Sequence, residues 1–449
     1  MDVSALSILI DFAIASALIV LGQLLRSKIK FIQNMLLPAS LLAGILGLLL
    51  RSFGLLPFSS QISSYSAILA SVLFAGMFIG EQQKQNLLKT CKKVRDTFAL
   101  NLASELGQFG FVVLIGTFIL KTFFPSVPDK MPVLAPGGFV GGHGYAAGIG
   151  STITGITGWD EAVMIGQTFA TIGILCGVFG GIVLIKIAVK KSWTSYIGDV
   201  SSLDRSMRTG FIESENQPGV VRDTTSSISI ESFTWHFGLL LTATGLSYGV
   251  NWLYEKLGGT IALPMVCLAM LCGMFLNLLL RVFHVSDYVN RKTISKMTSS
   301  ITDYLVFFGV ASIKIEIVFK YFTPIILMCI LCLTFSLLHM FVFSRKYFND
   351  HWFERAIFIY GWSTGVVAIG ITLLRIVDPD AKSNTLEDYG IAYAVISFIE
   401  IAVVALYPVF ISYGYSYLSA AVLIAAYIVL ILLARRWKSV QDTKNPVEN

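Results

Sequence analysis

Long apolar runs alternate with short polar connections along the whole chain. Eleven of these runs are long enough to cross a bilayer as helices, because a crossing takes about 20 mainly apolar residues. They lie at 5–25, 35–50, 64–80, 97–120, 162–187, 233–254, 261–280, 301–318, 322–343, 390–412 and 416–434. The pattern predicts an all-α polytopic membrane protein.

Two further apolar stretches, 131–157 and 356–377, differ from a straight span. From Pro136 the first reads PGGFVGGHGYAAGIGSTITGITG, and so many glycines argue against a lipid-facing helix. Backbone groups freed by such glycines must be satisfied by protein or by water in a cavity. We therefore expect both stretches to be re-entrant hairpins, which enter the membrane and return on the same side.

The distribution of basic residues favours the hairpins, because inner-side loops carry an excess of Lys and Arg. With the N-terminus outside and both stretches re-entrant, 27 of the 33 Lys and Arg lie inside, as does the C-terminus. Outside remain only Arg51, Lys121, Lys130, Lys256, Lys314 and Lys320. A crossing at 131–157 would put the basic stretch after residue 186 outside, against this rule.

The first apolar run, at 5–25, has its positive charges after it and not before it. We therefore expect this run to be a membrane span and not a cleavable signal peptide.

Composition supports the membrane class and excludes others. Charged residues make up 13% of the chain, against about a quarter in soluble domains. The net charge of +6 is spread over loops and not along one helical face, which argues against a nucleic-acid partner. Cys329 and Cys332 form a CxxC on an apolar run without another ligand nearby, so we interpret them as packing residues.

The chain also resembles itself. LLPASLLAGILGLLLRSF at 36–53 has a counterpart in ALPMVCLAMLCGMFLNLLLRVF at 262–283. Further on, FAG at 74–76 matches FFG at 307–309, and GGHGYAAGIG at 141–150 matches GWSTGVVAIG at 361–370. The elements occur in the same order in both halves, which indicates an internal repeat.

Five spans separate the two halves, an odd number, so the second repeat is expected upside down relative to the first. Inverted repeats with broken helices are typical of secondary transporters, whose sites lie at the midplane. The predicted organisation has a first repeat, a Ser-, Thr- and acid-rich inner linker, a second repeat and an extra C-terminal helix with a tail. Their bounds are 1–188, 189–231, 232–413 and 414–449.

The candidate substrate residues lie in the two hairpins. Glycines let the backbone approach a ligand, and N–H groups at half-helix N-termini attract carboxylates. The candidates are Gly141, Gly142, His143, Gly144, Ser151 and Thr152 in the first hairpin, and Ser363 and Thr364 in the second. In the alternative, the glycines only permit close helix packing. For His143 itself, the alternatives are a hydrogen-bond donor to substrate and a satisfied packing residue.

Acidic residues inside a membrane are costly, so they are candidates for function. Glu400 lies in the middle of the span after the second hairpin, and we interpret it as a cation ligand. Glu105 shares a polar stripe with Asn101 and Gln108, which is suited either to an ion or to joining helices. Further ion candidates, for which polar packing is the alternative, are Gln167, Thr168 and Thr171.

These motifs resemble the bacterial glutamate:sodium symporter family. That family carries GGHG in a Gly-rich hairpin before the fifth span, here at 141–144, and a Phe-Ile-acid-Ile pattern after the second hairpin, here at 398–401. FAGMFIG at 74–80 is similar to the end of the family's third span. The resemblance covers most of residues 1–412 in order.

The resemblance implies a homodimeric, elevator-type, sodium-coupled carrier in a bacterial inner membrane, with glutamate as the usual substrate and no cofactor besides Na⁺ as coupling ion. Two features depart from the family: the second hairpin reads Ser-Thr-Gly-Val-Val at 363–367 where the family has Thr-Pro-Thr, and the last span is extra. We expect symport of glutamate or a related amino acid or carboxylate. The alternatives are a citrate-type di- or tricarboxylate carrier and a membrane-embedded enzyme, although no catalytic spacing stands out.

Overall fold

The computed structural model describes residues 5–35, 37–80, 94–196, 205–217, 223–226, 228–258, 265–348, 350–379 and 381–444. Within these ranges all regular structure is helical, which confirms the all-α class. The first half contains α1 (Ala5–Lys28), α2 (Lys30–Met35), α3 (Ala39–Ser52), α4 (Ile62–Ala75), α6 (Arg95–Phe123), α7 (Met131–Thr157) and α8 (Ala162–Lys190). Parts of the predicted linker, 197–204, 218–222 and residue 227, lie outside the described residues.

The second half continues with α9 (Arg205–Thr209), α10 (Ser232–Lys256), α11 (Met265–Val282), α12 (Arg291–Ala311), α13 (Ile315–Lys320) and α14 (Phe322–Leu338). A π-helical turn, His339–Ser344, joins α14 to the short α15 (Arg345–Tyr347). The last helices are α16 (Trp352–Val377), α17 (Thr385–Ser412) and α18 (Ser416–Lys444). Each of the eleven apolar runs overlaps a helix within the described residues.

Seven helices of the described part are long and apolar enough to cross a membrane, which supports a multi-pass membrane protein. They are Ala5–Lys28, Arg95–Phe123, Ala162–Lys190, Phe322–Tyr347, Trp352–Val377, Val395–Ser412 and Ser416–Lys438. Three more of the expected spans are shorter apolar helices, at Ala39–Ser52, Ser64–Ala75 and Leu268–Val282. The helices α10 and α12 are not among either set; α12 begins with a polar half that carries Arg291, Lys292 and Lys296.

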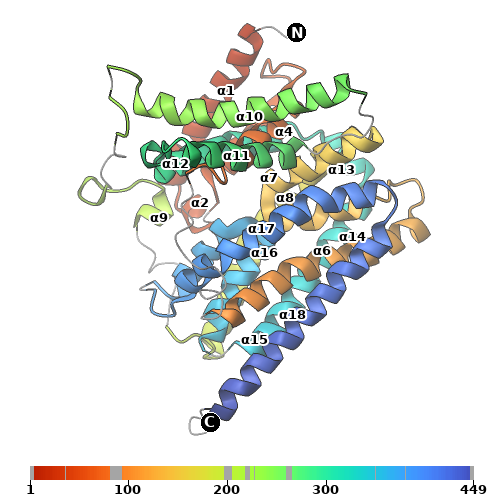
Figure 1. The fold of residues 1–449 in the computed structure, drawn as a ribbon. Helices are drawn as coiled ribbons and strands as arrows, with labels where there is room; N and C mark the ends of the chain where they lie inside the picture. The colour runs from red at the N-terminus through yellow and green to blue at the C-terminus, as the bar shows by residue number, and fades with distance from the viewer. Residues whose placement is uncertain are drawn as a thin grey trace.

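The helices form two groups, each drawn from both halves of the chain (Figure 1). In the first helix group, α1, α3 and α4 pack with α10, α11 and α12. In the second helix group, α6, α7 and α8 pack with α14, α16, α17 and α18. The groups meet mainly where α4 and α12 contact α7 and α8. That the two halves are inverted repeats stays a prediction.

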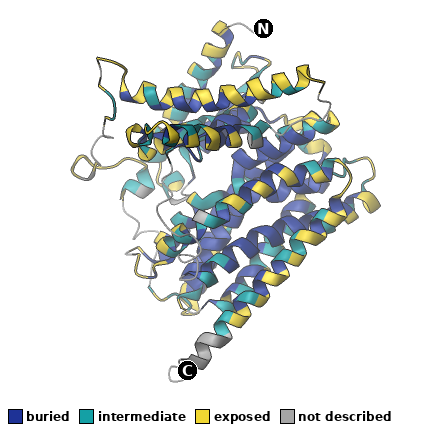
Figure 2. Cartoon of the chain, viewed as in Figure 1, coloured by how far each residue is buried: buried dark blue, intermediate teal, exposed yellow. Residues whose placement is uncertain are grey.

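Burial follows this grouping (Figure 2). The helices α7 and α16 lie inside the second helix group and are buried over most of their length. By contrast, α10 and α18 expose large apolar side chains such as Phe233, Leu418 and Val422, the last two at 64% and 60% exposure. Exposed apolar faces of this size fit a chain whose outer solvent is lipid.

The extra C-terminal helix is firmly packed. A Cβ atom built on Gly110 of α6 would lie 2.9 Å from Ile424 Cγ1 and 3.1 Å from Ile424 N, and one on Gly107 would meet the Tyr427 ring. Such close approach needs small residues at the contact, as is usual between membrane helices. The helix α18 is therefore an integral part of the second helix group.

Both predicted hairpin segments fold back on themselves. In α7, a Cβ atom on Gly137 would lie 2.5 Å from Ile149 Cδ1, although these residues would be about 18 Å apart along a straight helix. In α16, a Cβ on Gly361 would lie 2.7 Å from Gly370 Cα. Because α16 turns back, its length does not measure one straight crossing. That the hairpins enter the membrane from one side stays a prediction.

Candidate substrate and ion site

The turns of the two hairpins meet each other. The first turn lies at Gly142, with φ of 59° and ψ of −150°, and the second at Gly365–Val366, where Val366 has φ of 68° and ψ of 165°. A Cβ on Gly142 would lie 2.5 Å from Val366 Cγ1. A β-branched residue at positive φ is an outlier, and such outliers cluster at functional sites. We call this meeting point the hairpin junction.

The helix α8 forms the wall behind the junction. A Cβ on Gly173 would lie 2.6 Å from the Thr364 carbonyl oxygen, and one on Gly177 would lie 2.9 Å from Thr364 Oγ1. The glycines of α8 thus give the second hairpin room to reach the first. The Thr364 hydroxyl donates to the Tyr360 carbonyl at 2.6 Å, which keeps it within its own helix.

Backbone electrostatics make the junction attractive to anions. The second arm of each hairpin starts at its turn, and the first N–H groups of a helix have no partner within that helix. Helix N-termini carry roughly half a positive charge and bind carboxylates. Two such N-termini, those that follow Gly142 and Val366, converge at the junction.

His143 is fixed beside the first turn by α8. Its Nε2 lies 3.1 Å from Thr171 Oγ1, and the Thr171 hydroxyl donates to the Gln167 carbonyl at 3.0 Å. Because that hydroxyl proton is already used, we assign Nε2 as the donor, which leaves a lone pair on Nδ1 of the neutral ring. Nδ1 is buried and has no partner within the described residues.

Gln167, which also belongs to α8, holds the first turn as well. Its Nε2 donates to the His143 carbonyl at 3.1 Å. Its Oε1 is buried without a partner among the described residues and lies against Gly309 of α12, where an added Cβ would be 2.3 Å away. The first helix group therefore contacts the site through Gly309. His143 Nδ1 and Gln167 Oε1 are thus two buried acceptors, unpartnered within the described residues, on side chains at the first turn.

A second cluster of polar groups, the acid cluster, surrounds Glu105 and Glu400. Both side chains are buried, at 0% and 2% exposure, and they interact electrostatically. The side chains of Tyr145 and Tyr393 lie next to the Glu400 carboxylate. Tyr145 comes two residues after His143, so the first hairpin links the acid cluster to the junction. Glu400 Oε2 and both Glu105 oxygens have no hydrogen-bond partner in the described structure.

The unpartnered oxygens of the acid cluster fit a hard cation. Buried polar groups are normally hydrogen-bonded, and hard cations take carboxylate and carbonyl oxygens as ligands. On the same face of α6 as Glu105, Asn101 Oδ1 and Gln108 Oε1 are also buried without partners in the described part of the chain. The residues present thus suit Na⁺ as a transported ion.

The structure does not bring all the predicted residues together. Gly141, Gly142, His143, Gly144, Gln167 and Thr171 surround the first turn, and Glu105 and Glu400 approach each other. Ser151 and Thr152 lie more than two helical turns beyond Gly142, and both hydroxyls donate to the Gly148 carbonyl. Thr168 donates to the Met164 carbonyl. Ser363 and Thr364 end the first arm of the second hairpin, just before its turn.

Sequence reasoning missed three residues of the site. Val366 and Tyr145 come from the two hairpins, and Tyr393 lies seven residues before Glu400 on α17. That spacing, about two helical turns, puts Tyr393 on the face of Glu400 and was a usable signal. Tyr145 directly follows GGHG, although nothing in the sequence indicates that its ring reaches α17.

Comparison of the sequence with known protein families identifies the family of the chain. The sequence model of a family described as sodium/glutamate symporter matches residues 4–362. The match ends inside the second hairpin, directly before the Ser-Thr-Gly-Val-Val segment at 363–367. A search of curated proteins gives no match. Since the matched region is well over half of the chain, this protein belongs to the sodium/glutamate symporter family.

Proposed function

We propose that the chain carries glutamate or a closely related acidic amino acid across a bacterial inner membrane together with Na⁺. The observation that carries this proposal is the meeting of the two hairpin turns. It brings two helix N-termini to one place, which suits a substrate with two carboxylates. The family assignment of residues 4–362 supports the same class of substrate and coupling ion.

The acceptors at the junction favour an amino acid over a citrate-type substrate. An α-ammonium group offers three N–H donors. His143 Nδ1 and Gln167 Oε1 are two buried acceptors that lack donors in the described structure. A di- or tricarboxylate without an amino group would leave both acceptors unpaired, and each stranded group costs about 1–3 kcal/mol.

In the proposed coupling, Na⁺ binds at the acid cluster and the amino acid at the junction. Tyr145 lies next to Glu400 and belongs to the same helix arm as His143, so occupation of one site would position the other. Neutralising the buried carboxylates also lowers the cost of moving them through the membrane.

For transport we propose an elevator-type movement of the second helix group, with both hairpins, against the first helix group of a homodimer. The grouping of helices supports this mechanism, because α7, α8, α16 and α17 contact one another more extensively than they contact the first helix group. The N-terminus is proposed to lie outside and the C-terminus inside.

Uptake by proteoliposomes tests the function. Labelled L-glutamate should accumulate against its gradient when Na⁺ is higher outside, and should not do so with K⁺ in its place. Unlabelled L-aspartate should compete more strongly than citrate. Uptake without dependence on a Na⁺ gradient would refute the coupling, and stronger competition by citrate would favour the citrate-type alternative.

A further inference from the structure

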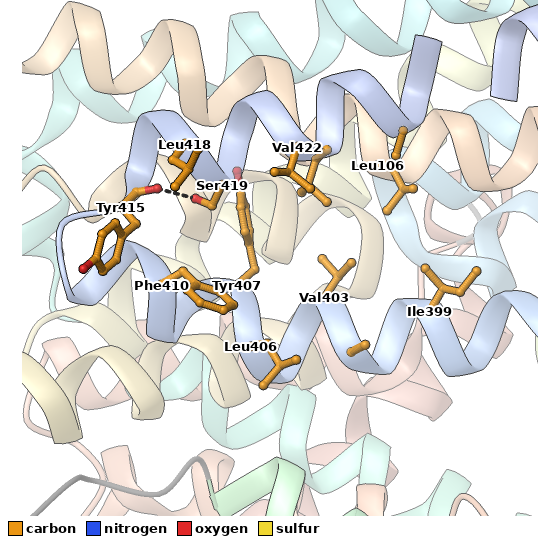
Figure 3. A pocket seen from close by; sticks show the side chains of 13 residues that line it. Leu106, Ile399, Val403, Leu406, Tyr407, Phe410, Tyr415, Leu418, Ser419 and Val422 are labelled. Atoms are coloured by element: carbon orange, nitrogen blue, oxygen red, sulfur yellow. Dashed lines mark hydrogen bonds between the residues drawn. The ribbon is translucent and has the colours of Figure 1, made fainter. Parts of the chain in front are cut away.

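A large apolar cavity lies between α17 and α18 (Figure 3). Its volume is about 710 Å³. Val403, Leu406 and Phe410 of α17 face Leu418 and Val422 of α18 across it. Leu106 of α6 contributes to its far end.

The lining excludes a polar occupant. Of the hydroxyl groups around the cavity, Tyr407 donates to the Phe109 carbonyl at 3.4 Å, and Ser419 donates to the Tyr415 carbonyl at 2.7 Å (Figure 3). A water molecule needs two to four polar partners to fill a buried space. The lining offers almost none, so the occupant has to be apolar.

The cavity is open to the surrounding lipid. Leu406, Phe410, Leu418 and Val422 are 50–64% exposed although they line it. Both helices are candidate membrane spans, at Val395–Ser412 and Ser416–Lys438. An apolar chain can therefore enter sideways from the bilayer.

The length of the cavity matches one leaflet. From Phe410 to Ile399 the lining extends along α17 for about 17 Å, at about 1.5 Å per residue. Half of the hydrocarbon core of a bilayer is about 15 Å. One acyl chain of one leaflet would run from the turn between α17 and α18 to Ile399.

The turn at the end of the cavity is suited to a phospholipid headgroup. Tyr413, Tyr415 and Tyr417 are 42–55% exposed there, as is common for tyrosines at a membrane interface. The Lys121 ammonium group lies over the Tyr417 ring, 5.4 Å from its centroid. Asp129 pairs with both Lys121 and Lys130, so this corner keeps a net positive charge that can attract a phosphate.

We propose that this cavity binds one acyl chain of a bilayer phospholipid, with the headgroup at the Tyr413–Tyr417 turn. The chain would support the acid cluster from behind, because the lining residues Leu106 and Ile399 are the sequence neighbours of Glu105 and Glu400. The proposal requires the membrane location of α17 and α18 and is independent of what the protein transports.

Photocrosslinking tests the proposal. The full-length protein is reconstituted into vesicles of phosphatidylethanolamine and phosphatidylglycerol that contain a phosphatidylglycerol with a diazirine in mid-chain. Ala426→Phe fills the cavity, since Ala426 lines it, whereas Ala425→Phe adds the same side chain at an exposed neighbour outside the lining. Ala402→Phe fills the cavity from the opposite wall, should Ala426→Phe fail to fold.

We expect wild type and Ala425→Phe to give crosslinked peptides from 399–410 and 415–426, and either filling variant to lose most of that signal. Added phospholipid should raise the melting temperature of the detergent-solubilised wild type more than that of the filling variants. Equal crosslinking of these peptides in all the proteins would show contact with bulk lipid only and would overturn the proposal. So would a spontaneous intersubunit disulfide from Val422→Cys, which would assign the cavity to a second copy of the chain.

Discussion

Replacing Gly142 by alanine perturbs the hairpin junction at its most constrained point. With φ of 59° and ψ of −150°, Gly142 has a conformation that is almost restricted to glycine. Holding another residue in such a region costs about 1–3 kcal/mol. The added methyl group would also lie 2.5 Å from Val366 Cγ1, so one of the two turns must shift. A strain of this size would lower the population of the observed junction by a factor of about 5 to 150. If substrate binds only to that conformation, its apparent affinity should fall by the same factor.

Gly144→Ala is the matched control for this substitution. Its methyl group would meet only Leu73 Cδ2, at 3.4 Å, which is an ordinary contact, and the residue is helical. We expect Gly144→Ala to keep a KM for glutamate close to that of wild type, measured as sodium-driven uptake by proteoliposomes. Unchanged KM in Gly142→Ala, or equal damage in both variants, would refute the role of the observed turn.

Three other substitutions follow from the same contacts. Glu400→Gln keeps the volume of the side chain but loses the carboxylate, so the Na⁺ concentration for half-maximal uptake should rise; an unchanged value would remove Glu400 from the ion site. Thr171→Val strands the Nε2 proton of His143 and should destabilise the protein by about 1–3 kcal/mol, seen as a lower melting temperature in detergent. Val366→Gly relieves the φ of 68° and should raise the melting temperature; an unchanged or lower melting temperature would show that the second turn stores no strain.

The sequence was sufficient for the helices and for the existence of the hairpins. Apolar runs of about 20 residues have few alternatives to helices in a membrane. The glycines around His143, and the basic residues that the predicted topology places inside, pointed to a folded-back segment. The short α3 and α4 and the polar first half of α12 show that the runs define helices better than they define full crossings.

The positions of the turns could not be read from the sequence. The internal repeat aligns Ser363 and Thr364 with His143 and Gly144, yet the second turn lies at Gly365–Val366. A valine at positive φ contradicts its local preference, and only the surrounding packing maintains it. From the sequence, Gly142 and Gly144 were also equivalent candidates, and the backbone angles of the structure separate them.

The pairing of the acid cluster was equally hidden. Glu105 and Glu400 are 295 positions apart in the chain and were separate ion candidates. Their proximity, and the hydroxyls of Tyr145 and Tyr393 between the helices, depend on how α6, α7 and α17 pack.

Labelling of a cysteine at the junction tests the central claim most directly. Val366→Cys in a background without the native cysteines puts a thiol where the two hairpin turns meet. If this is the site of a sodium-coupled amino-acid carrier, L-glutamate and Na⁺ together should slow the reaction of the thiol with a water-soluble maleimide, and either alone should slow it much less. A labelling rate that glutamate and Na⁺ leave unchanged, in protein that still takes up glutamate, would contradict the account.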